Sequence, residues 1–502
     1  MRIPLRAACV AALTLAIAGP AAAQEPAAPT YACPPVAIDA SHSVSCDAWT
    51  SPNVSYLGTI QQDVGLTTGA RVVPSTPEMR AAGIPDRLFV HDAKNFTVYD
   101  IDNPAQPRTM GHINLNVAWE GEEVPTDGKV IVLADDYLIA DPMCGTPGVG
   151  LVESGKGCVQ FFDVRDPSNI HEVAAVPAQN HTAECAAPKE DNTNDCEYVY
   201  GSYGTIIDAR NVLKDGTTKV LGDWIQDLKA QGVSEKSCHH IRQLRPGILL
   251  TACEPFTMIS INAEDGGSPS NPVVLATGAA PGGRFIHSSR WPRGGTDKFI
   301  FTGGENNFTG VCQDNESTFD VYNAEPVVNG GQDFGTPTDE LAPVNGTYTD
   351  GHAPAGELGC STHWFMEHPS FHNGGLVALS QYENGVRFLQ ITPAGKIKEV
   401  GYFVATGSSS SSPKWAPDGR TIYSMDYHRG IDILQWKGDT YVPNGQGLVV
   451  HKKGRVRGTS AAPPTAALKA ARIGEFSLLK QLRSVGWTPG FCQLMAQKYG
   501  NA

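Results

Sequence analysis

The chain has 502 residues, of which 38 are Lys or Arg and 52 are Asp or Glu, so its formal net charge is −14. This acidic balance argues against nucleic acid and anionic membranes as partners of the main body. The 53 Gly and 36 Pro residues are typical of a turn-rich all-β protein.

The first segment, residues 1–23, has the pattern of a secretory signal peptide. Arg2 and Arg6 precede an apolar stretch that ends in small residues, and we expect cleavage before Gln24. No later apolar run approaches ~20 residues, which predicts that no segment spans a membrane. We therefore expect an exported bacterial protein, in the periplasm or secreted, in which residues 24–52 form a disulfide-tied leader.

Seven strand–turn–strand units follow between residues 53 and 445. The first reads RLFVHDAKNFTVYD and the last TIYSMDYHRGIDILQW, each with two alternating apolar runs around a polar turn. Alternation of this kind indicates half-buried antiparallel strands. Seven such units closed in a ring predict an all-β, seven-bladed β-propeller. Residues 53–64 are expected to add the outer strand of the last blade, and a helix is expected near residues 224–232.

Cysteine spacing supports an oxidising compartment. Ten of the cysteines after the signal peptide fall into neighbouring pairs, as local disulfides would require. Cys492 is left over. The expected pairs are Cys33/Cys46, Cys144/Cys158, Cys185/Cys196, Cys238/Cys253 and Cys312/Cys360.

Three phrases of the chain carry a family resemblance: VYDIDNPAQPRTMGHI, FFDVRDPSNIHEVAAV and RGIDILQW. They resemble the LVIVD-repeat β-propeller proteins, whose blades show a strand, an aspartate, a small loop with Pro and another strand. The resemblance extends from Arg87 to Trp436. It implies a propeller fold and export, and it carries over no catalytic residue.

Four histidines stand just before four of the repeated units, in NHTAEC, CHHIRQL, FIHSSRW and CSTHWF. Equivalent positions of a circular repeat converge on its axis, so we expect a metal site at the mouth of the central channel. Glutamates in three of the turns are expected to accept the second imidazole N–H. The expected ligands are His181, His240, His287 and His363, with Glu254, Glu305 and Glu383 behind them. His239 competes with His240, because strand alternation lets only one of them face the channel.

Imidazole suits several transition metals, and we expect Fe or Cu before Zn. His428 and Arg290 are the candidate catalytic residues, as proton-transfer or charge-stabilising groups in the same turns. The expected function is that of a metal-dependent oxidoreductase or lyase acting on a small organic substrate. Separately, the acidic loop DNTND at residues 191–195 suggests a structural Ca²⁺.

A different class of function stays open. A non-enzymatic propeller scaffold would bind a protein or a polysaccharide on one face, through variable loops on rigid blades. It predicts an exposed aromatic patch, for which Trp119, Trp364 and Trp415 are candidates.

The last segment, residues 446–502, differs from the rest in charge. From residue 449 onward it holds nine Lys or Arg and a single acidic residue, Glu475. We expect a basic linker followed by a short amphipathic helix that docks on the propeller.

Overall fold

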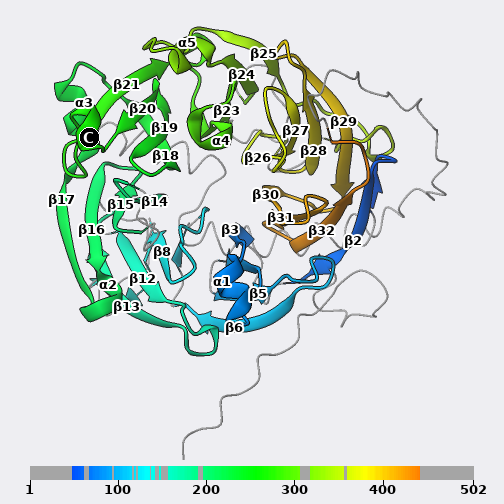
Figure 1. The fold of residues 1–502 in the computed structure, drawn as a ribbon. Helices are drawn as coiled ribbons and strands as arrows, with labels where there is room; N and C mark the ends of the chain where they lie inside the picture. Colours follow the sequence, from blue (N-terminus) through cyan, green and yellow to red (C-terminus); the bar gives the residue numbers. More distant parts are fainter. Residues whose placement is uncertain are drawn as a thin grey trace, which may run out of the picture.

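The computed structural model describes residues 48–440, except for short segments at 62–66, 93–94, 116–117, 120–121, 136, 139, 142–145, 148–156, 190–195, 306–316 and 355–358. These residues form seven antiparallel sheets arranged as blades around one axis (Figure 1). The predicted seven-bladed propeller is therefore confirmed. The predicted signal peptide, most of the leader, the basic linker and the C-terminal helix lie outside the described residues.

Within a blade, the strands follow chain order from the axis to the rim. The first three blades consist of β3 (Thr67–Val73), β4 (Arg87–Asp92), β5 (Asn95–Asp100) and β6 (Arg108–Asn114); β8 (Val130–Asp135), β12 (Cys158–Asp163) and β13 (His171–Pro177); and β14 (Ala183–Ala186), β15 (Tyr198–Gly201), β16 (Thr205–Asn211) and β17 (Thr217–Asp223). Two small ribbons flank the second blade: β7 (Ala118–Trp119) with β9 (Tyr137–Leu138), and β10 (Ala140–Asp141) with β11 (Thr146–Pro147).

The remaining blades repeat this order. They consist of β18 (Lys236–Arg245), β19 (Ile248–Glu254), β20 (Phe256–Ser260) and β21 (Val273–Gly278); β22 (Ile286–Arg290), β23 (Phe299–Gly304), β24 (Phe319–Asn323) and β25 (Pro337–Leu341); β26 (Phe365–Glu367), β27 (Gly375–Ser380), β28 (Val386–Ile391) and β29 (Ile397–Ala405); and β30 (Ser410–Trp415), β31 (Thr421–Asp426) and β32 (Gly430–Trp436).

The ring is closed by the beginning of the described chain. Strand β2 (Val54–Ile60) pairs with β32 as the outer strand of the last blade. The expectation for residues 53–64 is thus confirmed. Strand β1 (Ala48–Thr50) belongs to the expected leader, yet it pairs with β29 and gives the sixth blade a fifth strand.

Aspartates end several strands and explain the repeated sequence signature. Asp100 and Asp163, the last residues of β5 and β12, each accept the backbone N–H of the residue two positions later. Such Asx turns stop the strand and reverse the chain. The signature is therefore local turn chemistry repeated in successive blades.

The apolar core lies between neighbouring blades. Val132 of β8 packs with Val199 of β15, and Phe388 of β28 packs with Trp415 of β30. Each blade thus buries both faces, and β4 and β5 are buried along their whole length. Stacking of blades supplies the core that no single blade has.

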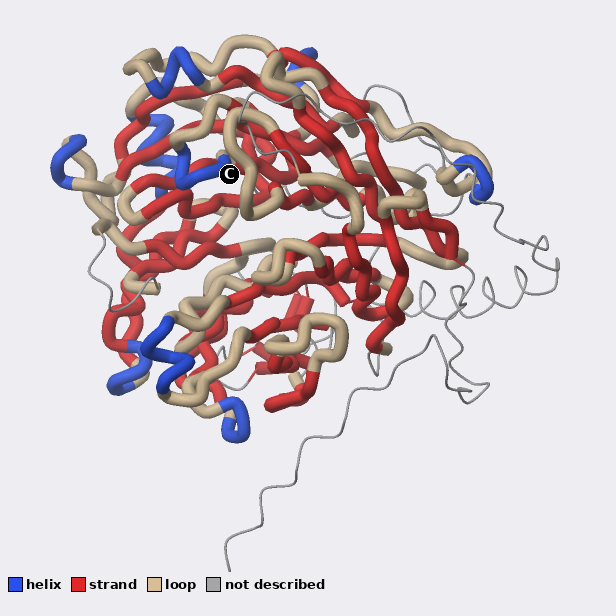
Figure 2. Tube along the Cα trace, turned by 45° about the vertical axis from the view of Figure 1, so that its right-hand side comes forward, coloured by secondary structure: helices blue, strands red, loops and turns tan. Residues whose placement is uncertain are grey.

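Helices are short connections between strands (Figure 2). The predicted helix near residues 224–232 is confirmed as α3, where the Asp223 side chain caps the N-terminus by accepting two backbone N–H groups. No helix among the described residues is long and apolar enough to cross a membrane. The helices are α1 (Pro77–Ala81), α2 (Val212–Asp215), α3 (Trp224–Ala230), α4 (Pro292–Gly295) and α5 (Glu325–Val328), with 3-10 turns η1 (Pro167–Asn169), η2 (Ala263–Asp265), η3 (Pro281–Gly283) and η4 (Tyr348–Asp350).

Two of the predicted disulfides are confirmed. Cys185 is joined to Cys196, and Cys238 to Cys253. Cys158 and Cys360 are disulfide-bonded as well. The predicted pairings of these two, the pair Cys33/Cys46 and the state of Cys492 lie outside the described residues.

Candidate metal centre on the propeller axis

Bulges in the innermost strands determine which side chains face the axis. In β22, Ile286 pairs with Gly304 and Ser288 with Gly303, so His287 is the extra residue of a bulge. In β18 the register is broken between Lys236 and His240, a stretch that contains His239. A bulge inserts a residue and re-aims side chains, and bulges are frequent beside active sites.

Three of these axial histidines converge on one carboxylate. Nε2 of His287 lies 3.2 Å from Oε2 of Glu122, and Nε2 of His239 lies 3.6 Å from the same oxygen. Nε2 of His363 lies 3.1 Å from Oε1. All four side chains are 0% exposed, so this cluster is fully buried rather than open at a channel mouth. We call these four residues the histidine cluster.

Two further side chains fix the Glu122 carboxylate. Trp364 Nε1 donates to Oε2 at 3.0 Å, and the Tyr427 hydroxyl donates to Oε1 at 3.1 Å. A second carboxylate, Glu305, accepts a 2.6 Å hydrogen bond from the Tyr382 hydroxyl. The ligand atoms of His287, Glu305 and His363 lie within 4.8 Å of one another, as do those of Glu122, His239 and His287. His287 therefore belongs to two potential metal-binding groups.

The electrostatics favour neutral His239 and His287 beside a charged His363–Glu122 pair. Burial and the charge of His363 lower the pKa of His287 to about 3. Burial, with the neighbouring histidines, also holds the pKa of His239 well below its ordinary value. Although burial lowers the pKa of His363, the charge of Glu122 raises it more, so the net shift is upward. Burial opposes the ionisation of Glu122, but His363 outweighs this effect and holds the Glu122 pKa well below its usual range.

The pattern of hydrogen bonding in the cluster fits a bound metal. Both ring nitrogens of His239, Nδ1 of His287 and Oε2 of Glu305 are buried and make no hydrogen bond to any described residue, while Nε2 of His287 and of His363 face the Glu122 carboxylate. A buried polar atom without a partner costs about 1–3 kcal/mol, so several together call for an explanation. Neutral imidazole nitrogens and carboxylate oxygens are the donors that transition metals accept.

The other two predicted histidine ligands lie differently. The ring of His181 lies 4.4 Å from that of His239, centroid to centroid, and borders the cluster. His240 instead packs its ring against Trp364 and places Nδ1 3.3 Å from the Thr182 hydroxyl. The structure thus brings His239, rather than the expected His240, to the cluster.

The three predicted glutamates also differ in whether they lie at the histidine cluster. Glu305 joins the cluster, whereas Glu254 accepts the backbone N–H of Ala280 and Glu383 accepts that of Gly359. Neither of these two belongs to a potential metal-binding group of the described residues.

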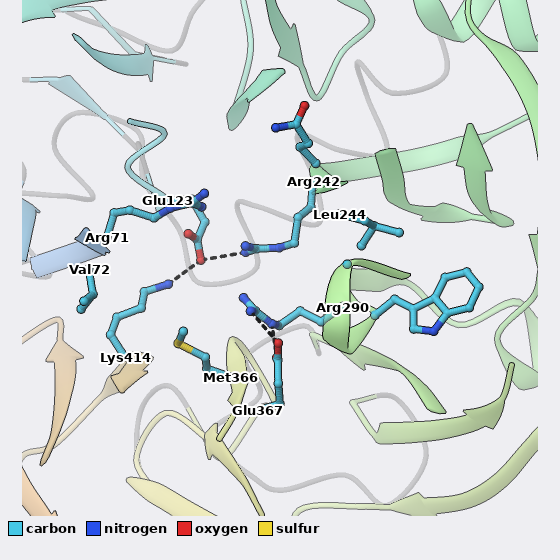
Figure 3. A pocket seen from close by; sticks show the side chains of 12 residues that line it. Arg71, Val72, Glu123, Arg242, Leu244, Arg290, Met366, Glu367 and Lys414 are labelled. Carbon is cyan, nitrogen blue, oxygen red and sulfur yellow. Dashed lines mark hydrogen bonds and ion pairs between the residues drawn. The ribbon is translucent and has the colours of Figure 1, made fainter. Parts of the chain in front are cut away.

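The two candidate catalytic residues lie outside the histidine cluster. Arg290 donates to both carboxylate oxygens of Glu367, at 2.5 and 3.1 Å, on the wall of a cavity (Figure 3). His428 stands in the turn after β31, where its backbone N–H is donated to Asp426. The loop expected to hold Ca²⁺, at residues 191–195, lies outside the described residues.

Glu122 is the functional residue that the strand pattern does not reveal. It begins a short segment that bridges Thr126 to Ile131 and so serves as the inner edge of the second blade. This is the place that the histidines hold in the next four blades. The available signal is the pair of acidic residues, Glu122 and Glu123, which the segment VPTDGK separates from the first apolar run of that blade.

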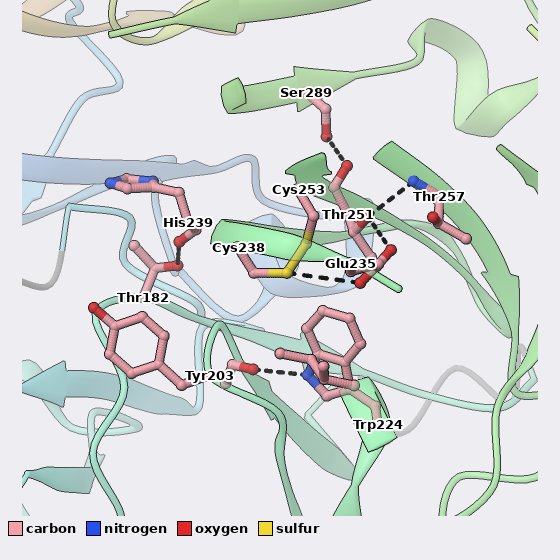
Figure 4. Close-up of a disulfide and its surroundings, with 12 residues drawn as sticks. Thr182, Tyr203, Trp224, Glu235, Cys238, His239, Thr251, Cys253, Thr257 and Ser289 are labelled. Atoms are coloured by element: carbon pink, nitrogen blue, oxygen red, sulfur yellow. Dashed lines mark hydrogen bonds between the residues drawn. A yellow bond between two sulfur atoms is a disulfide. The ribbon is translucent and has the colours of Figure 1, made fainter. Parts of the chain in front are cut away.

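A third potential ligand group involves the Cys238–Cys253 disulfide and Glu235 (Figure 4). Metals bind cysteine as thiolate, and a disulfide offers none. The Glu235 carboxyl accepts a 2.9 Å hydrogen bond from the Thr251 hydroxyl. We therefore assign this group a structural role.

The fold and the cluster together define a β-propeller with a buried histidine–carboxylate centre. No family model and no curated protein matches the chain, so the LVIVD-repeat resemblance stays a prediction. Among solved structures, Raptor of Chaetomium thermophilum is similar at 9% identity and TM-score 0.46, over 78% of this chain and 30% of that one. The WD40 repeats of RRP9 are similar at 9% identity and TM-score 0.45, over 79% and 99%. This likeness is too distant to inform function.

Proposed function

We propose that the chain is an exported, metal-dependent oxidoreductase or lyase acting on a small organic substrate. The observation that carries this proposal is the convergence of three buried imidazoles on the Glu122 carboxylate, with ring nitrogens that make no hydrogen bond to described residues. His239, His287 and His363 would hold the metal with Glu122. His181 and Glu305 would stand at its border.

The donor set informs the choice of metal. Mixed imidazole and carboxylate ligands are used by non-haem iron, and imidazole also suits copper and zinc. We therefore propose that the bound metal is Fe or Cu rather than Zn. Such an ion supplies Lewis acidity or one-electron chemistry to a bound organic molecule.

The chain's own residues would orient the centre and move protons. Trp364 and Tyr427 hold the Glu122 carboxylate in place through their hydrogen bonds. Such outer partners orient metal ligands. The Tyr382 hydroxyl and Glu305 share a 2.6 Å hydrogen bond beside His363, along which a proton can pass between the two oxygens.

The direct test is metal analysis of the full-length protein purified from the periplasm or the medium of an exporting host. We expect about one equivalent of iron or copper, and at least a tenfold loss in a His239→Ala/His287→Ala double variant. His171→Ala is the matched control, because His171 is exposed and bonds only locally to Asn169. Circular dichroism and melting temperature show whether the double variant folds. Absence of stoichiometric metal, or unchanged metal in the double variant, would contradict the proposal.

The scaffold alternative finds little support in the described surface. Trp364 and Trp415 are buried, at 1% and 2% exposure, and so cannot form the expected aromatic patch. The side chain of Trp119 is not among those described. The large apolar side chains exposed among described residues are Val220 on β17, Val328 on α5 and Val344 in the segment after β25. A chain without metal would nevertheless revive this alternative.

A further inference from the structure

A second ring of functional side chains lies along the axis next to the histidine cluster. In several inner strands a charged residue follows the axial residue by three positions, as in His239/Arg242 and His287/Arg290. Every blade contributes one charged residue to this ring, although Glu123 directly follows Glu122 and Glu367 follows His363 by four positions. We call this set the charged layer: Arg71, Glu123, Glu184, Arg242, Arg290, Glu367 and Lys414.

The charged layer surrounds a cavity of about 250 Å³. Six of its seven members line the cavity, all except Glu184. Figure 3 shows the cationic side chains of Arg242, Arg290 and Lys414 reaching toward the space that Glu123 and Glu367 also face. The volume is just below the range of about 300–1,000 Å³ typical of drug-sized ligands, so a smaller molecule fits.

Two cations of the layer have close carboxylate partners. Lys414 donates to Oε1 of Glu123 at 2.6 Å. Arg290 is bound through two hydrogen bonds to Glu367. Such charge-assisted pairs are strong and directional. These two cations are therefore satisfied without a ligand.

Arg242 is not satisfied in this way. Its Nη2 lies 3.3 Å from the same Glu123 oxygen that Lys414 holds, yet Nε and Nη2 make no hydrogen bond to any described residue. The side chain is only 9% exposed. A buried guanidinium that shares one carboxylate oxygen with a second cation is costly, because Nε and Nη2 have lost water without gaining a hydrogen bond.

The net charge of the charged layer also favours the binding of an anion. Its four cations exceed its three carboxylates by one positive charge. A monoanion would neutralise this excess, whereas a dianion would leave a buried negative charge. The planar fork of a guanidinium matches the geometry of a carboxylate.

We propose that this cavity binds a small organic monoanion through its carboxylate group, with Arg242 as the principal donor. Glu123 is adjacent in sequence to Glu122, and Arg242 follows His239 by three residues, so the cavity borders the histidine cluster. The rest of the bound molecule would then face that cluster. That the anion is the substrate rests on the proposed metal function; the binding itself does not.

Isothermal titration calorimetry of the full-length protein tests this inference. The probes are propionate and benzoate, their neutral amides propionamide and benzamide, and inorganic phosphate. We expect the carboxylates to bind, the amides not to bind, and phosphate to bind more weakly than the carboxylates. Arg242→Gln should weaken carboxylate binding about tenfold or more. Arg210→Gln should change nothing, because Arg210 is an exposed side chain paired with Asp208.

Circular dichroism establishes that the variants fold. If Arg242→Gln does not fold, Arg71→Gln replaces it, since that side chain is 31% exposed and its loss should still weaken binding several-fold. Equal binding of amides and carboxylates, tighter binding of phosphate, or an unchanged affinity in these variants would overturn the proposal. Metal content is measured on the same samples. Carboxylate binding without metal would refute the metal function alone, and metal without carboxylate binding would refute this inference alone.

Discussion

The free energy of unfolding should fall as pH rises because of the buried carboxyl group of Glu235. Glu235 lies buried beside the Cys238–Cys253 disulfide and accepts a hydrogen bond from the Thr251 hydroxyl (Figure 4). Burial raises the pKa of Glu235 to about 8, outweighing the hydroxyl contacts that lower it. We predict that Glu235→Gln, whose amide oxygen still accepts from Thr251, removes this pH dependence.

The sign and size follow from proton linkage. Between pH 4.5 and about 8 the folded protein keeps the Glu235 proton, whereas the unfolded chain has lost it. The free energy of unfolding from this group is therefore largest below pH 4.5 and falls as pH rises to 8. At about 1.4 kcal/mol per pH unit, this interval corresponds to roughly 5 kcal/mol as an upper limit.

The assay is guanidinium unfolding at pH 5 and pH 9, followed by tryptophan fluorescence, on wild type and Glu235→Gln. We expect similar stability at pH 5 and a variant more stable than wild type, by a few kcal/mol, at pH 9. Glu264→Gln, at an exposed carboxyl on η2, is the control and should follow wild type. An equal change in the free energy of unfolding between pH 5 and pH 9 for wild type and Glu235→Gln would refute the reasoning.

Three further outcomes follow from the structure. Gly69→Ala should lower metal content, because its Cβ would lie 1.8 Å from the Glu122 carbonyl oxygen and displace that segment. Metal analysis checks this. The control is Gly222→Ala, which should have no effect because the nearest atom to its Cβ would be 3.9 Å away. Cys238→Ala/Cys253→Ala should cost about 3 kcal/mol in the free energy of unfolding, since the bridge closes a loop of 15 residues; denaturation under non-reducing conditions measures it. Removal of residues 48–60 opens the ring, deletes the buried side chains of Val54 and Ile60 and uncovers β32, and calorimetry should show a loss of at least about 3 kcal/mol.

Most of the fold could be predicted because its determinants are local. Each hairpin carries its own alternation, and aspartates such as Asp100 and Asp163 end strands by bonding to nearby backbone. Closure by β2 was also predictable, because its apolar run has no partner within its own part of the chain. The addition of β1 to the sixth blade was not, since three residues carry too little pattern.

The site could be predicted only in part. His287 and His363 were found because the same blade position recurs along the chain. The choice between His239 and His240 depends on an irregularity in β18, and alternation cannot be counted across a bulge. Glu122 was missed because the inner edge of the second blade is too short to show any alternation.

The bulges also explain why two layers of side chains can lie along one set of strands. In a regular strand, residues three positions apart face opposite sides. The bulge at His287 adds one residue, so that His287 and Arg290 can face the same side of β22. The inner strand thus presents one residue to the histidine cluster and one to the charged layer. Substitutions at the first position should therefore act on metal content, and substitutions at the second on anion binding.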